Sequence, residues 1–153
     1  MRWCRQKKPI PRRYWLRRAQ NALYLHFQRS VDRADVSPQR FAALVLVAQN
    51  PGLRQGLLAD AMGLHRSGGM RLTDWLCEQG WVQRADDPLD RRSWTVHPTP
   101  AGLALLESVT AQVRTHDEAL LAALGDEGPQ LRRLLDRLAA AANALATPMP
   151  PSG

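Results

Sequence analysis

The hydrophobic period of the chain changes at Gly80, and this change limits the possible folds more than any other feature of the sequence. Before Gly80, apolar residues recur with the spacing of two short helices, over residues 54–62 and 66–79. Between them stands Gly63, which can take the left-handed backbone conformation that ends a helix. The first of these helices is predicted to bury Leu57, Leu58 and Ala61. The sequence therefore predicts two helices joined by a tight turn.

After Gly80, apolar side chains alternate with polar ones, which is the period of a β-strand. Residues 81–84 and 94–98 fit two strands, and the charged residues 86–92 between them fit a turn. A helix pair with a glycine turn is a common arrangement, but the hairpin that follows it narrows the choice. Together these features predict a helix-turn-helix with a β-hairpin wing, whose second helix suits the major groove of DNA.

Longer helices are predicted on both sides of this unit. Residues 14–33 carry apolar side chains at helical spacing, and a last helix is predicted over residues 127–146. Ser37-Pro38 and Thr99-Pro100 each combine a capping hydroxyl with a proline at the first helical position. The first helix and the last two helices carry more apolar residues than one winged helix-turn-helix can bury. We therefore expect these apolar side chains to need a partner.

The charge of the chain points to a polyanionic partner. The formal net charge is +7 and the isoelectric point is near 10.6, which favours nucleic acid first and an acidic membrane surface second. Eight of the 21 basic residues lie within residues 1–18, which contain no acid, whereas residues 37–98 hold seven basic and six acidic residues. The excess is an N-terminal arm, which is either a solvated tail or a further contact to DNA.

Several classes of protein are not expected. No apolar stretch approaches the roughly 20 residues that cross a bilayer, and no apolar segment follows the first basic residues, so we expect a cytoplasmic protein without a membrane span. Two cysteines are too few for a disulfide framework or a zinc site. The four histidines lie on four different predicted elements, and no catalytic constellation has supporting context. We expect no enzyme, no cofactor and no metal.

The predicted wing and the residues after it carry two short motifs. The wing reads Asp87-Pro88-Leu89-Asp90-Arg91-Arg92, and the next helix starts with Thr99-Pro100-Ala101-Gly102. Before the wing stand Leu58-Ala59, Gly63-Leu64, Arg66-Ser67, Arg71-Leu72, Leu76 and Gly80. With this Asp-Arg-Arg and Thr-Pro-x-Gly, residues 37–106 resemble the MarR (multiple antibiotic resistance regulator) family. The resemblance implies a transcriptional regulator. Our main hypothesis is a repressor that binds pseudo-palindromic operator DNA as a homodimer and is released by a small, aromatic effector.

The resemblance and the element pattern together imply a mainly α fold with a small β-hairpin wing, in which a winged helix-turn-helix is flanked by terminal dimerisation helices. The expected parts are a basic arm (1–13), a dimerisation helix (14–36), a winged helix-turn-helix DNA-binding domain (37–98), C-terminal dimerisation helices (99–146) and a disordered tail (147–153). The alternative function is a winged-helix protein-interaction module without sequence-specific DNA binding.

The second helix of the pair, over residues 66–79, is the recognition helix. Its first turns carry the candidates for reading bases, which are Arg66, Ser67, Met70 and Arg71. Arginine can bond a guanine with two hydrogen bonds, and a methionine can lie against a thymine methyl group. By family resemblance, Arg92 enters or borders the minor groove while Asp90 holds it in place. Phosphate contacts are predicted for Arg84 and Arg91, and for the helix N-terminus at Ser37 and Gln39.

Two departures from the family pattern affect the recognition helix. Gly68 and Gly69 stand in its first turns, where each costs a helix roughly 1 kcal/mol relative to alanine, so we expect a helix that is loose until DNA orders it. Trp75 stands where the family commonly has a solvent-facing basic residue. It either packs beneath the wing or contacts the sugar backbone of DNA.

The resemblance also suggests an effector site between the dimerisation helices and the winged domain. The candidates to line it are Trp15, Tyr24, His26 and His116. Each also has a structural explanation, because Tyr24 fits a core position and His116 fits a satisfied interface histidine. Sensing of peroxide by a thiol is not expected, since Cys4 precedes the first helix and Cys77 lies beside the core residue Leu76.

Overall fold

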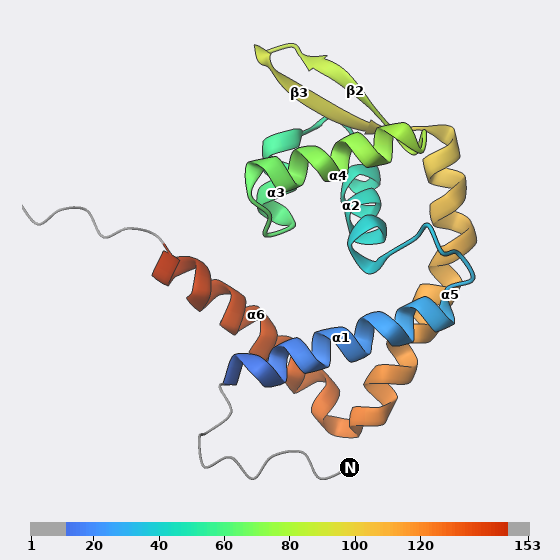
Figure 1. Cartoon of the computed structure of the whole chain (residues 1–153), viewed down its shortest axis with the longest axis vertical. Coiled ribbons are helices and arrows are strands. Elements are labelled where there is room, and N and C mark those ends of the chain that lie inside the picture. The colour runs from blue at the N-terminus through green and yellow to red at the C-terminus, as the bar shows by residue number, and fades with distance from the viewer. Residues whose placement is uncertain (1–11, 147–153) are drawn as a thin grey trace, which may run out of the picture. The chain divides into compact units, whose positions relative to one another are not determined.

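A computed structural model describes residues 12–146, with all side chains except those of Arg12, Arg91, Arg92 and Ala146. Its elements are α1 (Arg12–Ser30), α2 (Pro38–Gln49), β1 (Leu53–Arg54), α3 (Gln55–Ala61), α4 (Arg66–Glu78), β2 (Val82–Asp87), β3 (Asp90–Pro98), α5 (Pro100–Leu124), a 3-10 turn (Gly125–Glu127) and α6 (Gly128–Ala146). Figure 1 labels the helices and the two strands of the hairpin. The chain divides into two compact units, and the boundary lies within α5, after Val113. The mainly α fold with a small wing is confirmed. The basic arm lies largely outside the described residues, and the predicted tail lies wholly outside them.

The wing belongs to a three-stranded antiparallel sheet with the order β1-β3-β2. β2 runs to Asp87 and β3 starts at Asp90, so the predicted turn over residues 86–92 is too long. The strands continue through charged residues because cross-strand hydrogen bonds do not require apolar side chains. β1 was not predicted, since two residues are too few to show a period. It pairs with β3 through Leu53 and Val96 and anchors the hairpin to the N-terminus of α3.

The core of the first unit lies where its helices meet the sheet. Its most deeply buried side chains are Leu44 of α2, Leu58 of α3, Leu76 of α4, Val96 of β3 and Val109 of α5. α3 buries Leu58 and Ala59, while Leu57 and Ala61 are exposed, so the predicted inward face is confirmed at Leu58 and wrong at Leu57 and Ala61. A helix of seven residues has too few apolar positions to define its face from spacing alone.

Both predicted capping pairs start helices. The Ser37 hydroxyl accepts a hydrogen bond from the Arg40 backbone N–H at 3.3 Å, and Pro38 is the first residue of α2. The Thr99 hydroxyl accepts from the Gly102 N–H at 3.1 Å and donates to the Gly80 carbonyl at 2.5 Å. This second cap attaches the start of α5 to the end of α4.

Gly102 makes that attachment possible. A Cβ at this position would overlap the carbonyl oxygen of Trp81 and lie 2.9 Å from its carbonyl carbon. Glycine is therefore required for α5 to pass this close to the Trp81 backbone, whose carbonyl also accepts a hydrogen bond from the Thr99 N–H. The Thr-Pro-x-Gly sequence is a helix start combined with a close backbone contact.

The terminal helices leave much of their apolar surface uncovered. Phe27 of α1 and Val31, which follows the end of that helix, are buried, as are Val109 and Val113 of α5. Exposed apolar residues are Tyr14, Trp15, Leu16, Leu23, Tyr24 and Leu25 on α1, and Leu131, Leu134, Leu135, Leu138 and Leu145 on α6. None of the helices in the described part of the chain is both long and apolar enough to span a membrane.

Candidate nucleic-acid interface

The N-terminal half of α4 presents an outward face made by four of the predicted residues. Arg66, Ser67, Met70 and Arg71 are exposed on this face. The opposite face is buried and includes Leu72, Thr73 and Leu76. Among the described residues, neither Arg66 nor Arg71 has a hydrogen-bond or ion-pair partner for its guanidinium. Their donors are free to reach base edges or phosphates.

Gly69 lies at the closest approach of α3 and α4. A Cβ here would overlap the Cβ of Ala59 and lie 3.1 Å from the Ala59 Cα. A Cβ at Gly68 would lie 3.6 Å from the Leu64 Cβ, which is an ordinary contact. Gly69 therefore has a packing role, because a residue without a Cβ lets the two helices pack with their backbones close together. The expectation that the helix is loose until DNA orders it stays a prediction.

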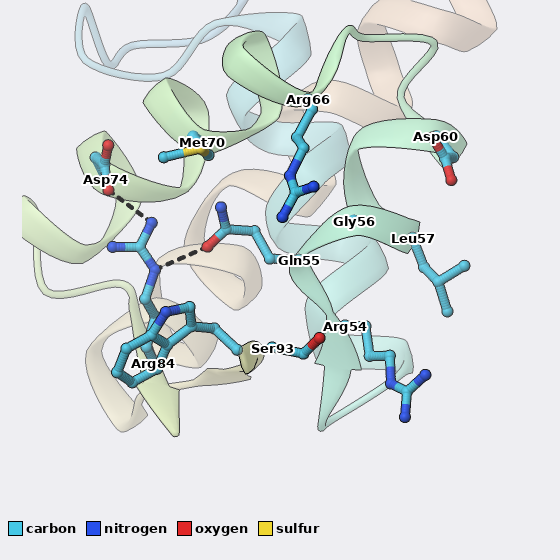
Figure 2. Close-up of a pocket in the computed structure, with 11 residues that line it drawn as sticks. Arg54, Gln55, Gly56, Leu57, Asp60, Arg66, Met70, Asp74, Arg84 and Ser93 are labelled. Atoms are coloured by element: carbon cyan, nitrogen blue, oxygen red, sulfur yellow. Dashed lines mark hydrogen bonds and ion pairs between the residues drawn. The ribbon is translucent and has the colours of Figure 1, made fainter. Parts of the chain in front are cut away.

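A groove of about 490 Å³ opens between α4, the start of α3 and the wing (Figure 2). Its lining residues are Arg54, Gln55, Gly56, Leu57, Asp60, Arg66, Met70, Asp74, Arg84, Ser93 and Trp94. Two of the predicted base-reading residues, Arg66 and Met70, therefore share one surface with the wing. Three exposed apolar side chains, Leu57, Met70 and Trp94, lie among its polar groups. Such a surface offers cations to phosphates together with apolar contacts to sugars and methyl groups.

Arg84 of β2 points into this groove and is held by two other elements. Its Nε donates to Gln55 Oε1 of α3 at 2.9 Å, and its Nη2 donates to Asp74 Oδ1 of α4 at 2.6 Å, as the dashed lines in Figure 2 mark. The side chain is 26% exposed. The sequence analysis predicted a phosphate contact for Arg84, but its guanidinium already has two protein partners.

A second arginine connects β1 to the end of β2. Arg54 Nε donates to Asp87 Oδ2 at 2.5 Å, and Asp87 is only 3% exposed. The other oxygen of Asp87 accepts the Leu89 N–H at 2.9 Å. The Leu89 hydrogen bond, more than the Arg54 contact, lowers the pKa of the Asp87 carboxyl. Asp87 therefore joins the turn of the wing to β1 as a carboxylate.

Sequence reasoning gave no role to Arg54, Gln55 or Asp74. Their partners lie far along the chain, and no local period reveals such contacts. One signal was available for Arg84, because it lies two residues after the buried Val82 on a strand and so shares the inward face.

The tip of the wing is described in part. Asp90 Oδ2 accepts a hydrogen bond from the Ser93 hydroxyl at 2.8 Å. Arg91 and Arg92 lie on β3, but their side chains are outside the described residues. The contact of Asp90 with Arg92, and the two arginines' contacts with DNA, stay predictions.

The N-terminus of α2 carries the other two predicted phosphate contacts. Ser37 is the half-buried cap of this helix, and Gln39 is exposed in its first turn. The Ser37 hydroxyl already satisfies the Arg40 N–H, one of the first free backbone donors of the helix. A phosphate contact at Ser37 or Gln39 stays a prediction.

Trp75 packs within the protein. The Arg40 guanidinium carbon lies 3.6 Å from the centre of the Trp75 ring system, and the Trp81 ring meets it edge-on at 5.0 Å and 82°. Arg40 Nη1 also donates to the Asp35 carbonyl at 3.0 Å. Trp75 therefore packs inside the protein, but its partners come from α2 and from the residue just before β2, not from the strands of the wing.

The four effector candidates do not line the groove between α4 and the wing. Trp15 and Tyr24 are exposed, so the expectation of a core position for Tyr24 is wrong. His26 Nδ1 lies 3.4 Å from the Ser30 hydroxyl. His116 belongs to the second unit and is 5% exposed, with Nε2 3.8 Å from Asp117 Oδ1.

Cys77 is partly buried on α4, and desolvation raises the pKa of its thiol. The reactive thiolate form is therefore disfavoured at neutral pH. Cys4 lies outside the described residues.

Comparison with known proteins gives one consistent result. A profile of the MarR family matches residues 34–93, which include α2, the helix pair and most of the wing. A putative transcriptional regulatory protein for the hcr operon of Thauera aromatica is 36% identical over 127 residues, covering 82% of this chain and 76% of that protein.

Solved structures of similar fold are also transcriptional regulators. The transcriptional repressor CouR, bound to a 23-mer DNA duplex, is 32% identical, with a TM-score of 0.74 over 86% of this chain and 92% of its own. The PcaV regulator of Streptomyces coelicolor, solved with its natural ligand, is 26% identical, with a TM-score of 0.81. The match covers 88% of this chain and 99% of PcaV. These relatives are transcriptional regulators. The chain belongs to the MarR family and is a winged-helix, DNA-binding transcriptional regulator.

Proposed function

We propose that the protein is a repressor that binds pseudo-palindromic operator DNA as a homodimer. The observation that carries this proposal is the outward face of α4, where Arg66 and Arg71 are exposed and Arg66 also lines the groove shared with the wing. Exposed arginines on the first turns of a recognition helix suit bidentate contacts to guanine. In this proposal residues 37–98 are the DNA-binding domain, and the protein acts in the cytoplasm.

The uncovered apolar surface of the terminal helices supports the homodimer. Leucines of α6 and aromatic residues of α1 are exposed in the single chain, and large apolar patches on soluble proteins mark interfaces. A two-fold dimer places two recognition helices in successive major grooves, roughly 34–36 Å apart. Residues 14–36 and 99–146 would then form the dimerisation region.

A small aromatic effector that releases the DNA is the third part of the proposal. A relative, PcaV, was solved with its natural ligand, and Trp15 of this chain offers an exposed indole on α1. Trp15, Tyr24, His26 and His116 remain the candidate contacts. We expect an aromatic acid that binds to raise the melting temperature of the protein and to lower its affinity for DNA. Alanine at Trp15 should weaken both effects.

The experiment that tests DNA reading is selection of bound sequences from a random duplex library. We expect the wild type to enrich a site with two-fold symmetry, and Arg66→Ala and Arg71→Ala to lose or relax part of it. Arg114→Ala is the control, because it removes one exposed arginine of α5 that does not line the groove, and it is compared as an intact dimer. Absence of any enriched site, with dimers intact, would overturn the proposal and favour the protein-interaction module.

A further inference from the structure

Three elements meet at the guanidinium of Arg84, and each supplies one part of the contact. The arginine comes from β2 of the wing, Asp74 from the recognition helix α4, and Gln55 from the first residue of α3. Figure 2 shows the side chain reaching from the wing towards both helices. Nε and Nη2 donate in different directions, which a planar, forked guanidinium can do and an ammonium group cannot reproduce.

The position of Arg84 in the sheet explains its direction. It lies opposite Val96 in the β2–β3 register, and Val96 is fully buried. Opposite residues of an antiparallel pair project from the same face, so Arg84 leaves the wing on the face that packs against the helices. This is the base of the wing. The arginines predicted to meet DNA, Arg91 and Arg92, stand near its tip.

The charge of Arg84 is already balanced. Asp74 Oδ1 lies 2.6 Å from Nη2, and about three quarters of the arginine side chain is covered. Two of the five guanidinium N–H donors are in use, and a phosphate that took one of the others would have to approach the Asp74 carboxylate, which repels it. Arg66 meets no such repulsion from an ion-pair partner, since it has no partner among the described side chains.

We propose that Arg84 is a positioning residue, which holds the wing at a fixed angle to the recognition helix through Asp74 and Gln55 and does not neutralise a phosphate. The wing and the recognition helix contact DNA together, so their relative angle decides whether both can bind at once. This inference rests on the proposed operator binding. It reverses the role that the sequence pattern assigned to Arg84.

The test measures affinity for the selected operator with full-length variants. Arg84→Lys keeps the charge and loses the fork, so we expect about a tenfold loss, similar to that of Arg84→Ala. A phosphate contact would instead survive largely intact in the lysine variant. Gln55→Ala changes no charge and removes one of the two contacts, so it should weaken operator binding by about threefold.

Asp74→Ala separates the two roles by the sign of its effect. If Arg84 positions the wing, removing its anchor weakens operator binding by about tenfold, and the Asp74→Ala/Arg84→Ala double variant is little worse than either single variant. If Arg84 contacts a phosphate, freeing it from Asp74 and removing a negative charge tightens binding. Tighter operator binding by Asp74→Ala would overturn the proposal.

The salt dependence of binding gives an independent readout. Each phosphate contact adds about 0.9 to the slope of log affinity against log salt, so two lost contacts in a dimer lower it by about 1.8. A displaced wing would also lose its own phosphate contacts, so the slope is compared in a background without the wing-tip arginines, Arg91→Ala/Arg92→Ala. In that background we expect Arg84→Ala to leave the slope unchanged. A further fall of about 1.8 would show a phosphate contact of Arg84 itself and would overturn the proposal.

Folding is checked by circular dichroism and sedimentation, and only variants that form native dimers are compared. The coupling of Asp74 to Arg84 is also measured by thermal unfolding without DNA. If the wild type binds no specific sequence while that coupling is present, the proposed operator binding fails and the ion pair is structural alone. If the wild type binds and the variants behave as phosphate contacts, only the positioning role fails.

Discussion

A methyl group added at Gly69 tests how closely the two helices of the helix-turn-helix pack. The new Cβ would overlap the Ala59 Cβ and lie 3.1 Å from the Ala59 Cα. Both atoms are fixed to the helix backbone and cannot rotate away, so α3 and α4 must separate. Such overpacking costs roughly 1–3 kcal/mol, and alanine returns about 1 kcal/mol through its higher helix propensity. We expect Gly69→Ala to lower the free energy of unfolding by about 1 kcal/mol and to weaken operator binding.

Gly68→Ala is the matched control, because it adds the same group one residue earlier in the same helix. Its Cβ would lie 3.6 Å from the Leu64 Cβ, an ordinary contact, and the position is not in the left-handed region. This variant should therefore raise the free energy of unfolding by up to about 1 kcal/mol. The two variants should differ by about 2 kcal/mol in urea unfolding of the full-length dimer, measured at one protein concentration.

Removing the obstructing methyl group provides a second check. Ala59→Gly combined with Gly69→Ala should be more stable than the sum of the two single changes predicts, because the Cβ overlap is gone. If Gly68→Ala and Gly69→Ala stabilise the protein equally, the helices are not in close contact at this point. The reasoning about Gly69 would then be refuted.

Three further predictions concern the core, the wing and the arm. Gly102→Ala should destabilise the protein by about 2 kcal/mol or more in thermal unfolding, because its Cβ meets the Trp81 carbonyl oxygen, and native stability would contradict this. The Asp87 pKa is lowered in the fold, so its stabilising effect is present above an unfolded pKa of about 3.9 and is lost below it. The stability gap between wild type and Asp87→Asn should therefore shrink as pH falls below about 4, whereas a constant gap would argue against it. Deleting residues 1–12 should weaken DNA binding and lower its salt slope; unchanged values would show a solvated tail.

Local sequence signals predicted the element types well. Ser37-Pro38 and Thr99-Pro100 start helices, and Gly63 and Gly80 take left-handed conformations after α3 and α4. These features depend on a few neighbouring residues, because a capping hydroxyl or a positive backbone angle acts within one turn of chain. Their positions could therefore be predicted without knowledge of the rest of the fold.

Predictions that needed a partner from elsewhere in the chain did less well. β1 exists only because β3 offers hydrogen bonds to Leu53 and Arg54, and two residues alone have no strand pattern. The length of the hairpin was underestimated for a similar reason, since charged residues 86–92 look like a turn until they are paired across the wing. The inward face of α3 was misjudged at Leu57 and Ala61 because its contact with α4 decides which side is buried.

The sequence by itself determined the order of helices and strands, the turns and caps between them, and the outward face of α4 with Arg66 and Arg71. Tertiary structure alone decided which polar groups are already occupied: Arg84 on Asp74 and Gln55, and Arg54 on Asp87. The physical reason is how far apart along the chain the interacting groups lie. Helix periods and caps arise from contacts a few residues apart, whereas an ion pair depends on the distance between two charges, and the chain brings these together from up to 33 positions apart.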